Sequence, residues 1–270
     1  MFYPVQVDLS DKSRVERATV VLNPAASKRL LAKAVATLPE VRSAYTGGRL
    51  AVCTSSANSF VLEELTGEKV PAYRYCVGMV ADGMLTASVA DDRVPPRFFE
   101  KGKKVEMEAL AFFDTFEKGD AVIKGANAVD AQGNAGVLAS NKQGGTIGGL
   151  LSFVVLRGVP MIMPVGLEKS VASVPDAAAG WGQLTLVKSM GLTPWLFPVT
   201  AGLVVTEIQA LGILAGVNVR HIASGGLAGS EGAVVLLLEG YGENVSKAWD
   251  LVQSVKDEPR VEVPRHQYSS

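Results

Sequence analysis

The stretch of residues 120–166 constrains the fold more than any other part of this chain. Two short apolar runs come first, and a glycine-rich turn follows at residues 141–146. A helix-length apolar segment then fills residues 147–156, before a proline-flanked apolar run at 159–165. Strand, glycine-rich turn, helix and strand in this order are typical of a βαβ crossover. We therefore predict two parallel strands joined through a helix in the middle of the chain.

The glycine-rich turn is a candidate anion site. Ligands of βαβ units lie at the carboxyl ends of the strands, and the backbone N–H groups of a turn that opens a helix attract anions. Lys142 adds a positive charge to this turn; the alternative is that it is a solvated loop lysine. The ligand contacts expected from the turn are Asn141, Lys142, Gly144, Gly145 and Thr146.

An earlier part of the chain repeats this arrangement. Residues 50–53 have the pattern of a buried strand, residues 60–65 have helical spacing, and a run of small polar residues lies between them. Small residues let a backbone approach a ligand, and hydroxyl groups either donate to phosphate oxygens or cap the helix. The expected contacts from this loop are Thr54, Ser55, Ser56 and Asn58; the alternative is an ordinary helix cap without a ligand.

Composition and charge exclude several classes of protein. The net charge is −1 and the pI is near 6.2, so no overall field favours nucleic acid or an anionic membrane. No apolar run approaches the roughly 20 residues that a membrane span needs, and the first residues lack the pattern of a secretory signal. Two cysteines and two histidines are too few for a disulfide framework or a histidine-built metal site. We expect a cytoplasmic protein without metal or cofactor.

Alternating helices and apolar strands over residues 27–166 predict an open, mostly parallel α/β sheet of the Rossmann-like kind. The last third has the order βαββαβ, which is typical of a ferredoxin-like α+β domain. We place the boundary near residue 190, which gives domains of residues 1–190 and 191–270. The elements expected after the boundary are strands at 196–199, 217–223, 233–238 and 261–263 and helices at 204–214 and 245–255.

The central stretch resembles the superfamily that includes glucosamine-6-phosphate deaminase, ribose-5-phosphate isomerase and the CoA transferases. It is most similar to the branch of methylthioribose-1-phosphate isomerases and related initiation-factor subunits, whose pattern joins Gly-Ala-Asp, a later glycine, Asn-Lys-x-Gly-Thr and Gly-(Ile/Val)-Pro. The loop at residues 54–59 resembles the family's first phosphate-binding loop. The matching positions of the central stretch are Gly125-Ala126-Asn127, Gly133, Asn141-Lys142, Gly144-Gly145-Thr146 and Gly158-Val159-Pro160.

This resemblance implies a homo-oligomeric sugar-phosphate isomerase that uses acid/base catalysis, but two features depart from the pattern. The glutamate that the isomerases place on the helix after the glycine-rich turn is missing from residues 146–149. Asn127 stands where the isomerases have a catalytic aspartate, and an amide binds a sugar hydroxyl without shuttling a proton at neutral pH. Asp130 is the nearest substitute, and the family also has a proton-transferring cysteine close to Cys53. Glu168 is a candidate base because of its place after a strand.

Each of these residues also has a structural alternative. Asp130 and Asn127 are turn-forming residue types, Cys53 fits a buried structural thiol, and Glu168 fits a surface pair with Lys169. Two functions therefore stay open at this point: an enzyme acting on a phosphorylated small molecule, or a non-catalytic binding or regulatory protein that kept the fold and the anion site. Acyl-CoA chemistry is a weaker third possibility.

Overall fold

Four parallel strands form the centre of the computed structural model, which describes residues 1–265. They belong to a six-stranded, mostly parallel sheet of order β12-β10-β7-β2-β5-β6. The last two strands pair antiparallel at one edge. The strands are β2 (Arg49–Val52), β5 (Arg97–Glu100), β6 (Lys103–Val105), β7 (Ala121–Ile123), β10 (Met161–Pro164) and β12 (Leu203–Val205).

The parallel strands are buried on both faces, as their continuous apolar sequences require. In β2, Leu50 and Val52 pack into one hydrophobic cluster while Ala51 packs into the other. In β7, Ile123 and Val122 divide between the two clusters in the same way. Side chains alternate across a strand, so a run without polar residues supplies both cores at once.

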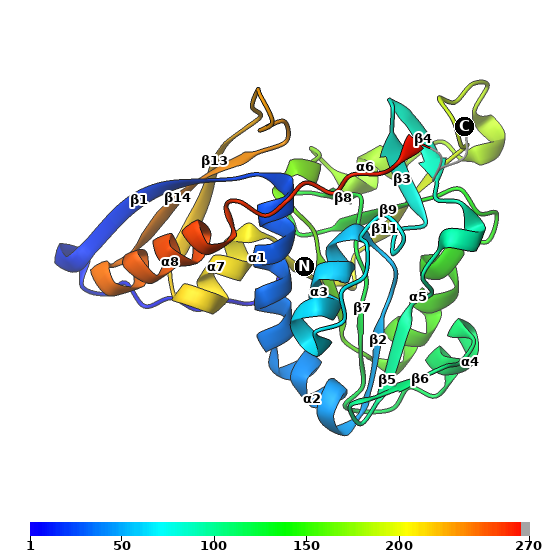
Figure 1. Cartoon of the computed structure of the whole chain (residues 1–270), viewed down its shortest axis with the longest axis horizontal. Helices are drawn as coiled ribbons and strands as arrows, with labels where there is room; N and C mark the ends of the chain where they lie inside the picture. The colour runs from blue at the N-terminus through cyan, green and yellow to red at the C-terminus, as the bar shows by residue number, and fades with distance from the viewer. Residues whose placement is uncertain (266–270) are drawn as a thin grey trace.

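Helices cover both faces of this sheet and give the chain a mixed α/β fold (Figure 1). Proline in the first turn starts the first two helices, and Ser55 caps the third. One face carries α1 (Pro24–Thr37), α2 (Pro39–Gly47) and α3 (Ser56–Thr66), and the other carries α4 (Ala109–Asp114) and α5 (Gly145–Arg157).

The predicted crossover is confirmed, with one difference in its pairing. The strands β7 and β10 are parallel neighbours, and α5 lies between them in the chain. The second apolar run forms β9 (Ala135–Ala139), which pairs antiparallel with β8 (Ala128–Val129) and β11 (Trp195–Val199) in a separate sheet. Apolar periodicity predicts that a segment is a strand, but it does not predict which strand pairs with it.

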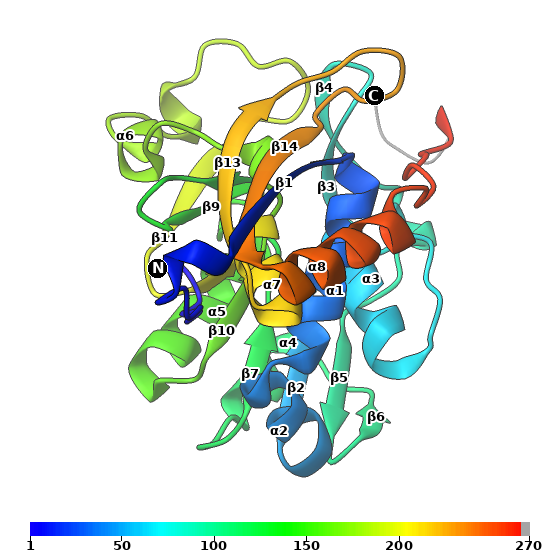
Figure 2. The ribbon, with the colours of Figure 1, turned by 90° about the vertical axis from the view of Figure 1, so that its left-hand side faces the viewer.

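A second antiparallel sheet has the order β1-β14-β13, and helices lie between it and the main sheet (Figures 1 and 2). Its strands are β1 (Val15–Leu22), β13 (Asn218–Ser224) and β14 (Val234–Tyr241), and the associated helices are α7 (Glu207–Ala215) and α8 (Gly242–Val255). Alternate residues of β14 are buried, and Val245, Ala248 and Val252 form the buried stripe of α8. This is the pattern of a sheet with one face covered by helices.

Three expectations for the last third need correction. The helix expected over residues 204–214 is present but begins at Glu207, because β12 ends at Val205 and Thr206 caps α7. Residues 261–263 form no strand, and the strand at 195–199 pairs with β9 instead of joining β13 and β14. The third strand of that sheet is β1, from the start of the chain. Each of the three larger sheets therefore combines strands from both sides of residue 190.

A hairpin that matters for the site is β3 (Gly78–Ala81) with β4 (Met84–Ala87). Asp82 and Gly83 join the two strands, and both have positive φ, at 47° and 72°, which is typical of a tight Asp-Gly turn. A short helix, α6 (Val174–Ala178), is capped by Ser173. Within residues 1–265, no helix has the length and apolar character needed to cross a membrane.

Candidate functional site

Polar side chains follow all four parallel strands at their carboxyl ends. A cavity of about 440 Å³ lies at this edge of the sheet. This is the edge at which open α/β sheets bind ligands. The polar residues are Thr54, Ser55 and Ser56 after β2, Lys124 and Asn127 after β7, Glu168 and Lys169 after β10, and Thr206 and Glu207 after β12.

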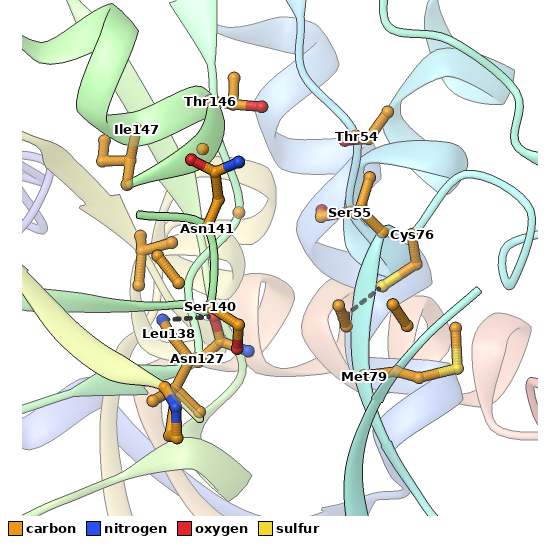
Figure 3. Close-up of a pocket in the computed structure, with 18 of the residues that line it drawn as sticks. Thr54, Ser55, Cys76, Met79, Asn127, Leu138, Ser140, Asn141, Thr146 and Ile147 are labelled. Carbon is orange, nitrogen blue, oxygen red and sulfur yellow. Dashed lines mark hydrogen bonds between the residues drawn. The ribbon is translucent and has the colours of Figure 1, made fainter. Parts of the chain in front are cut away.

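The cavity lies between two walls (Figure 3). Thr54, Ser55 and Cys76 lie on one side, and Asn141 and Thr146 lie on the other. The first wall comes from the start of α3 and the β3–β4 hairpin, and the second from β9 and the start of α5. The two loops singled out in the sequence therefore line the same cavity, although about 90 residues separate them in the chain.

The first wall is held by hydrogen bonds at the start of α3. The Ser55 hydroxyl accepts from the Asn58 backbone N–H at 3.0 Å. Asn58 is fully buried and its side-chain amide donates to the carbonyls of Cys53 and Ile123, at 2.7 and 3.2 Å. Asn58 thus ties β2 to β7 and does not line the cavity. Gly125 is close by, and a Cβ there would lie only 2.4 Å from the Ser55 hydroxyl oxygen.

The second wall contains the start of α5, where the backbone leaves N–H groups without a side-chain cap. Gly144 is the N-cap residue in the left-handed conformation, and it has no side chain to cap the helix. The residues Gly144, Gly145 and Thr146 line the cavity. The first N–H groups of a helix have no partner within it and carry its positive dipole end, so they favour an anion here.

The lysines that line the cavity are not the lysine that the turn suggested. Lys142 is exposed and lies outside the lining, whereas Lys124 and Lys169 belong to it. Lys124 is 7% exposed and donates to the Gly125 carbonyl at 3.2 Å, and Lys169 donates to the Ala126 carbonyl at 3.0 Å. Within residues 1–265, neither forms a salt bridge with a carboxylate. A lysine directly after a buried apolar run was the available signal for Lys124.

Burial dominates the electrostatics around Lys124. It lowers the pKa of the Lys124 ammonium, and nearby Lys169 lowers it further, although Cys53 and Cys76 oppose the shift. Burial also raises the pKa of the Cys53 thiol to about 11, and it raises that of Cys76. Both thiols are therefore protonated at neutral pH and do not balance a charge on Lys124.

A different charged group lies behind the cavity, after β10 and β12. The Lys28 ammonium is 3.9 Å from a Glu168 carboxylate oxygen, and the fully buried Glu207 accepts from the Leu167 N–H at 2.9 Å. Burial and then the charge of Glu168 raise the pKa of Glu207 to about 7. The second carboxylate oxygen of Glu168 is buried and has no hydrogen-bond partner among residues 1–265.

The predicted catalytic residues lie outside the cavity lining, whereas Asn127 belongs to it. Asp130 accepts backbone N–H groups from Gln132, Asn134 and Val174, so its carboxylate holds a turn together. Burial opposes ionisation of Asp130, but these hydrogen bonds and one from the Asn134 side chain keep its pKa below the ordinary value. The Asn127 side-chain oxygen accepts from the Leu138 N–H at 3.0 Å.

The predicted site residues therefore separate into two groups by position. The predicted contacts that line the cavity are Thr54, Ser55, Ser56, Asn127, Asn141, Gly144, Gly145 and Thr146. The candidates outside the lining are Cys53, Asn58, Asp130, Lys142 and Glu168. Within residues 1–265, no three His, Cys, Asp or Glu side chains are grouped closely enough to hold a metal ion.

No protein-family model matches the chain, and no curated protein matches its sequence. The resemblance to sugar-phosphate isomerases therefore stays a prediction.

Proposed function

We propose that this protein binds a phosphorylated small molecule in the cavity between the starts of α3 and α5. One observation carries the proposal: Lys124 and Lys169 line a cavity that also receives the uncapped start of α5, and no carboxylate within residues 1–265 forms a salt bridge with either lysine. Three sources of positive potential therefore converge on one space.

Charge balance favours a ligand with more than one negative charge. Placing an ammonium in a buried site without a partner is unfavourable, and a bound anion removes that cost. A phosphate monoester carries up to two negative charges and several acceptor oxygens, so it can accept from both lysines and from backbone N–H groups together. The hydroxyls of Thr54, Ser55 and Thr146 line the same space and supply further donors.

The rest of the cavity suits a small organic group. Its volume of about 440 Å³ is within the usual range of small-molecule sites. The apolar part of its lining includes Met79, Leu85, Val137, Leu138 and Ile147. A phosphate at the polar edge and a carbon skeleton against these side chains would together fill such a site.

Sugar-phosphate isomerisation is the catalytic form of this proposal, with Glu168 as the candidate base. A non-catalytic binding or regulatory role is the second candidate, and the neighbourhood of Asn127 favours it. The amide oxygen of Asn127 is already bound to Leu138, and Asp130 is occupied by backbone donors. Turnover of a bound sugar phosphate, with its loss in Glu168→Gln, would distinguish the enzyme from the binding protein.

We also propose kinship with the isomerase and CoA-transferase superfamily, as a cytoplasmic homo-oligomer. The parallel sheet and the shared cavity of the two loops support this relationship. The ferredoxin-like domain is supported by the antiparallel sheet of order β1-β14-β13, together with α7 and α8. If this sheet belongs to a ferredoxin-like domain, β1 is the first strand of that domain, and the elements of the main sheet are inserted in the chain between β1 and α7.

The proposal is tested by a thermal-shift screen of the purified protein against sugar phosphates, nucleotides, CoA esters and inorganic phosphate. A bound ligand raises the melting temperature by mass action. We expect phosphorylated compounds to raise it in the wild type and in Lys142→Ala, and to have little effect in Lys169→Met. An absence of any shift, or an equal shift in Lys169→Met, would refute the proposed site.

A further inference from the structure

Lys124 has the surroundings of a reactive amine. It follows the central strand β7, lines the cavity, and is 7% exposed. In the part of the chain that the structure describes, the titratable groups that act on it are the thiols of Cys53 and Cys76 and the ammonium of Lys169, and none of them is a carboxylate. An ammonium in such a place is favoured neither by solvent nor by a counter-ion.

This environment favours the neutral form of the lysine, which is the nucleophilic form. Enzymes that form imines use a lysine that is desolvated or placed beside another cation, and both conditions hold for Lys124. The lowered pKa of Lys124 agrees with this geometry. Lys169 is less buried and Lys142 is exposed, so neither has the same surroundings.

We propose that the Lys124 amine forms an imine with a small phosphorylated aldehyde or ketone bound in the cavity. The inference rests on the proposed function for its ligand class, and it adds a reaction and a nucleophile. In this form Lys169 and the start of α5 bind the phosphate, and Lys124 contacts the carbonyl group of the ligand instead of the phosphate. The nitrogen attacks the carbonyl carbon, a C–N bond forms, and the carbonyl oxygen takes up a proton. The carbinolamine then loses this oxygen as water, so one aldehyde or ketone and one amine give one imine and one water.

The proposal also explains how the site could work without an acid at position 127. A protonated imine withdraws electrons from the neighbouring carbon and makes its C–H bond more acidic. Proton removal beside a carbonyl is the step that the isomerases assist with acids, and the imine would assume part of that task. Lys169 is the nearby cation that can stabilise or protonate the departing oxygen, because within residues 1–265 only one of its three donors is in use.

The test is reductive trapping on the full-length protein. Wild-type protein is incubated at neutral pH with dihydroxyacetone phosphate or glyceraldehyde 3-phosphate and sodium cyanoborohydride, which adds hydride to an imine carbon. Peptide mass mapping then gives the labelling rate at each lysine. We expect Lys124 to be labelled several-fold faster than exposed Lys142, because burial beside Lys169 favours the free amine of Lys124 and because Lys124 lines the cavity that holds the probe. Equal rates at the two lysines would overturn the proposal.

Two variants and one unphosphorylated probe separate this inference from the proposed function. Lys124→Arg keeps a positive charge but forms no imine under these conditions, and Lys124→Gln serves if the arginine does not fold. A thermal shift with the phosphorylated probes but no wild-type adduct at Lys124 would retain phosphate binding and refute the imine. If dihydroxyacetone labels Lys124 as fast as dihydroxyacetone phosphate does, the result would support Lys124 as the nucleophile and contradict recognition of the phosphate. Neither a shift nor an adduct would refute both.

Discussion

Two groups of buried and half-buried charges lie at the carboxyl ends of the parallel strands, and they differ in how charge is balanced. Behind the cavity, Lys28 faces Glu168, and Glu207 lies beside them with a raised pKa. In the cavity, Lys124 and Lys169 have backbone carbonyls as partners and form no salt bridge with a carboxylate of residues 1–265. The first group is completed by the protein itself, whereas under the proposed function a ligand would complete the second.

Lys28→Met should have the largest effect, because it removes the cation from the balanced group. It leaves Glu168 and Glu207 buried near each other without a positive partner, which typically costs about 3–5 kcal/mol. Urea denaturation would measure this loss, and the double variant with Glu168→Gln should recover part of it. The matched control is Lys33→Met, whose pair with Glu64 is more exposed and is expected to contribute under about 1 kcal/mol. A loss as small as that of the control would contradict the comparison.

Glu207→Gln should change how stability depends on pH. The pKa of Glu207 rises from its ordinary value of 4.5 to about 7 in the folded protein, so the folded state keeps the proton longer than the unfolded state. Stability from this group therefore falls as pH rises through this window, by on the order of 3 kcal/mol in all. Denaturation of both proteins at about pH 5 and about pH 8 isolates the effect. A constant difference between the two proteins across this range would show that Glu207 does not titrate there.

Lys124→Met sharpens the comparison, since its effect on stability should have the opposite sign to that of Lys28→Met. Removal of a buried ammonium without a counter-ion should leave the ligand-free protein unchanged or more stable, by up to about 1 kcal/mol. The same change should weaken binding of a phosphorylated ligand roughly tenfold or more, the usual effect of losing a charge-assisted hydrogen bond. Urea denaturation without ligand and titration with ligand test the two halves. A large loss of stability would show that Lys124 has a structural role.

The sequence predicted local structure better than it predicted pairing. The helical segments at residues 60–65 and 147–156 were predicted from the spacing of neighbouring residues, and both lie within helices of the structure. The pairing of β1 with β14 joins residues more than 200 positions apart. Apolar periodicity does not specify such a partner, because the same alternation suits any sheet with one covered face.

For the site, too, local features were predicted from the sequence, whereas features that depend on long-range packing were not. The loops at residues 54–56 and 144–146 were recognised from their small and glycine residues, and both line the cavity. Lys124 and Lys169 were not selected as ligand contacts, because the burial that makes them unusual depends on packing between distant elements. Lys142 was selected because a lysine beside two glycines fits an anion site, but the position of a side chain around a turn is not visible in a sequence.

Lys142→Ala should therefore have the smallest effect, and it decides between the two interpretations of the glycine-rich turn. Lys142 is exposed and outside the cavity lining, so its loss should change stability by under about 0.5 kcal/mol and ligand affinity by less than about twofold. Titration of wild type, Lys142→Ala and Lys169→Met with the same phosphorylated ligand at two salt concentrations is the measurement. Long-range attraction from an exposed charge would disappear at high salt, whereas direct contact would persist. A large, salt-resistant loss in Lys142→Ala would restore Lys142 as the anion ligand, and the turn would have to rearrange when the ligand binds.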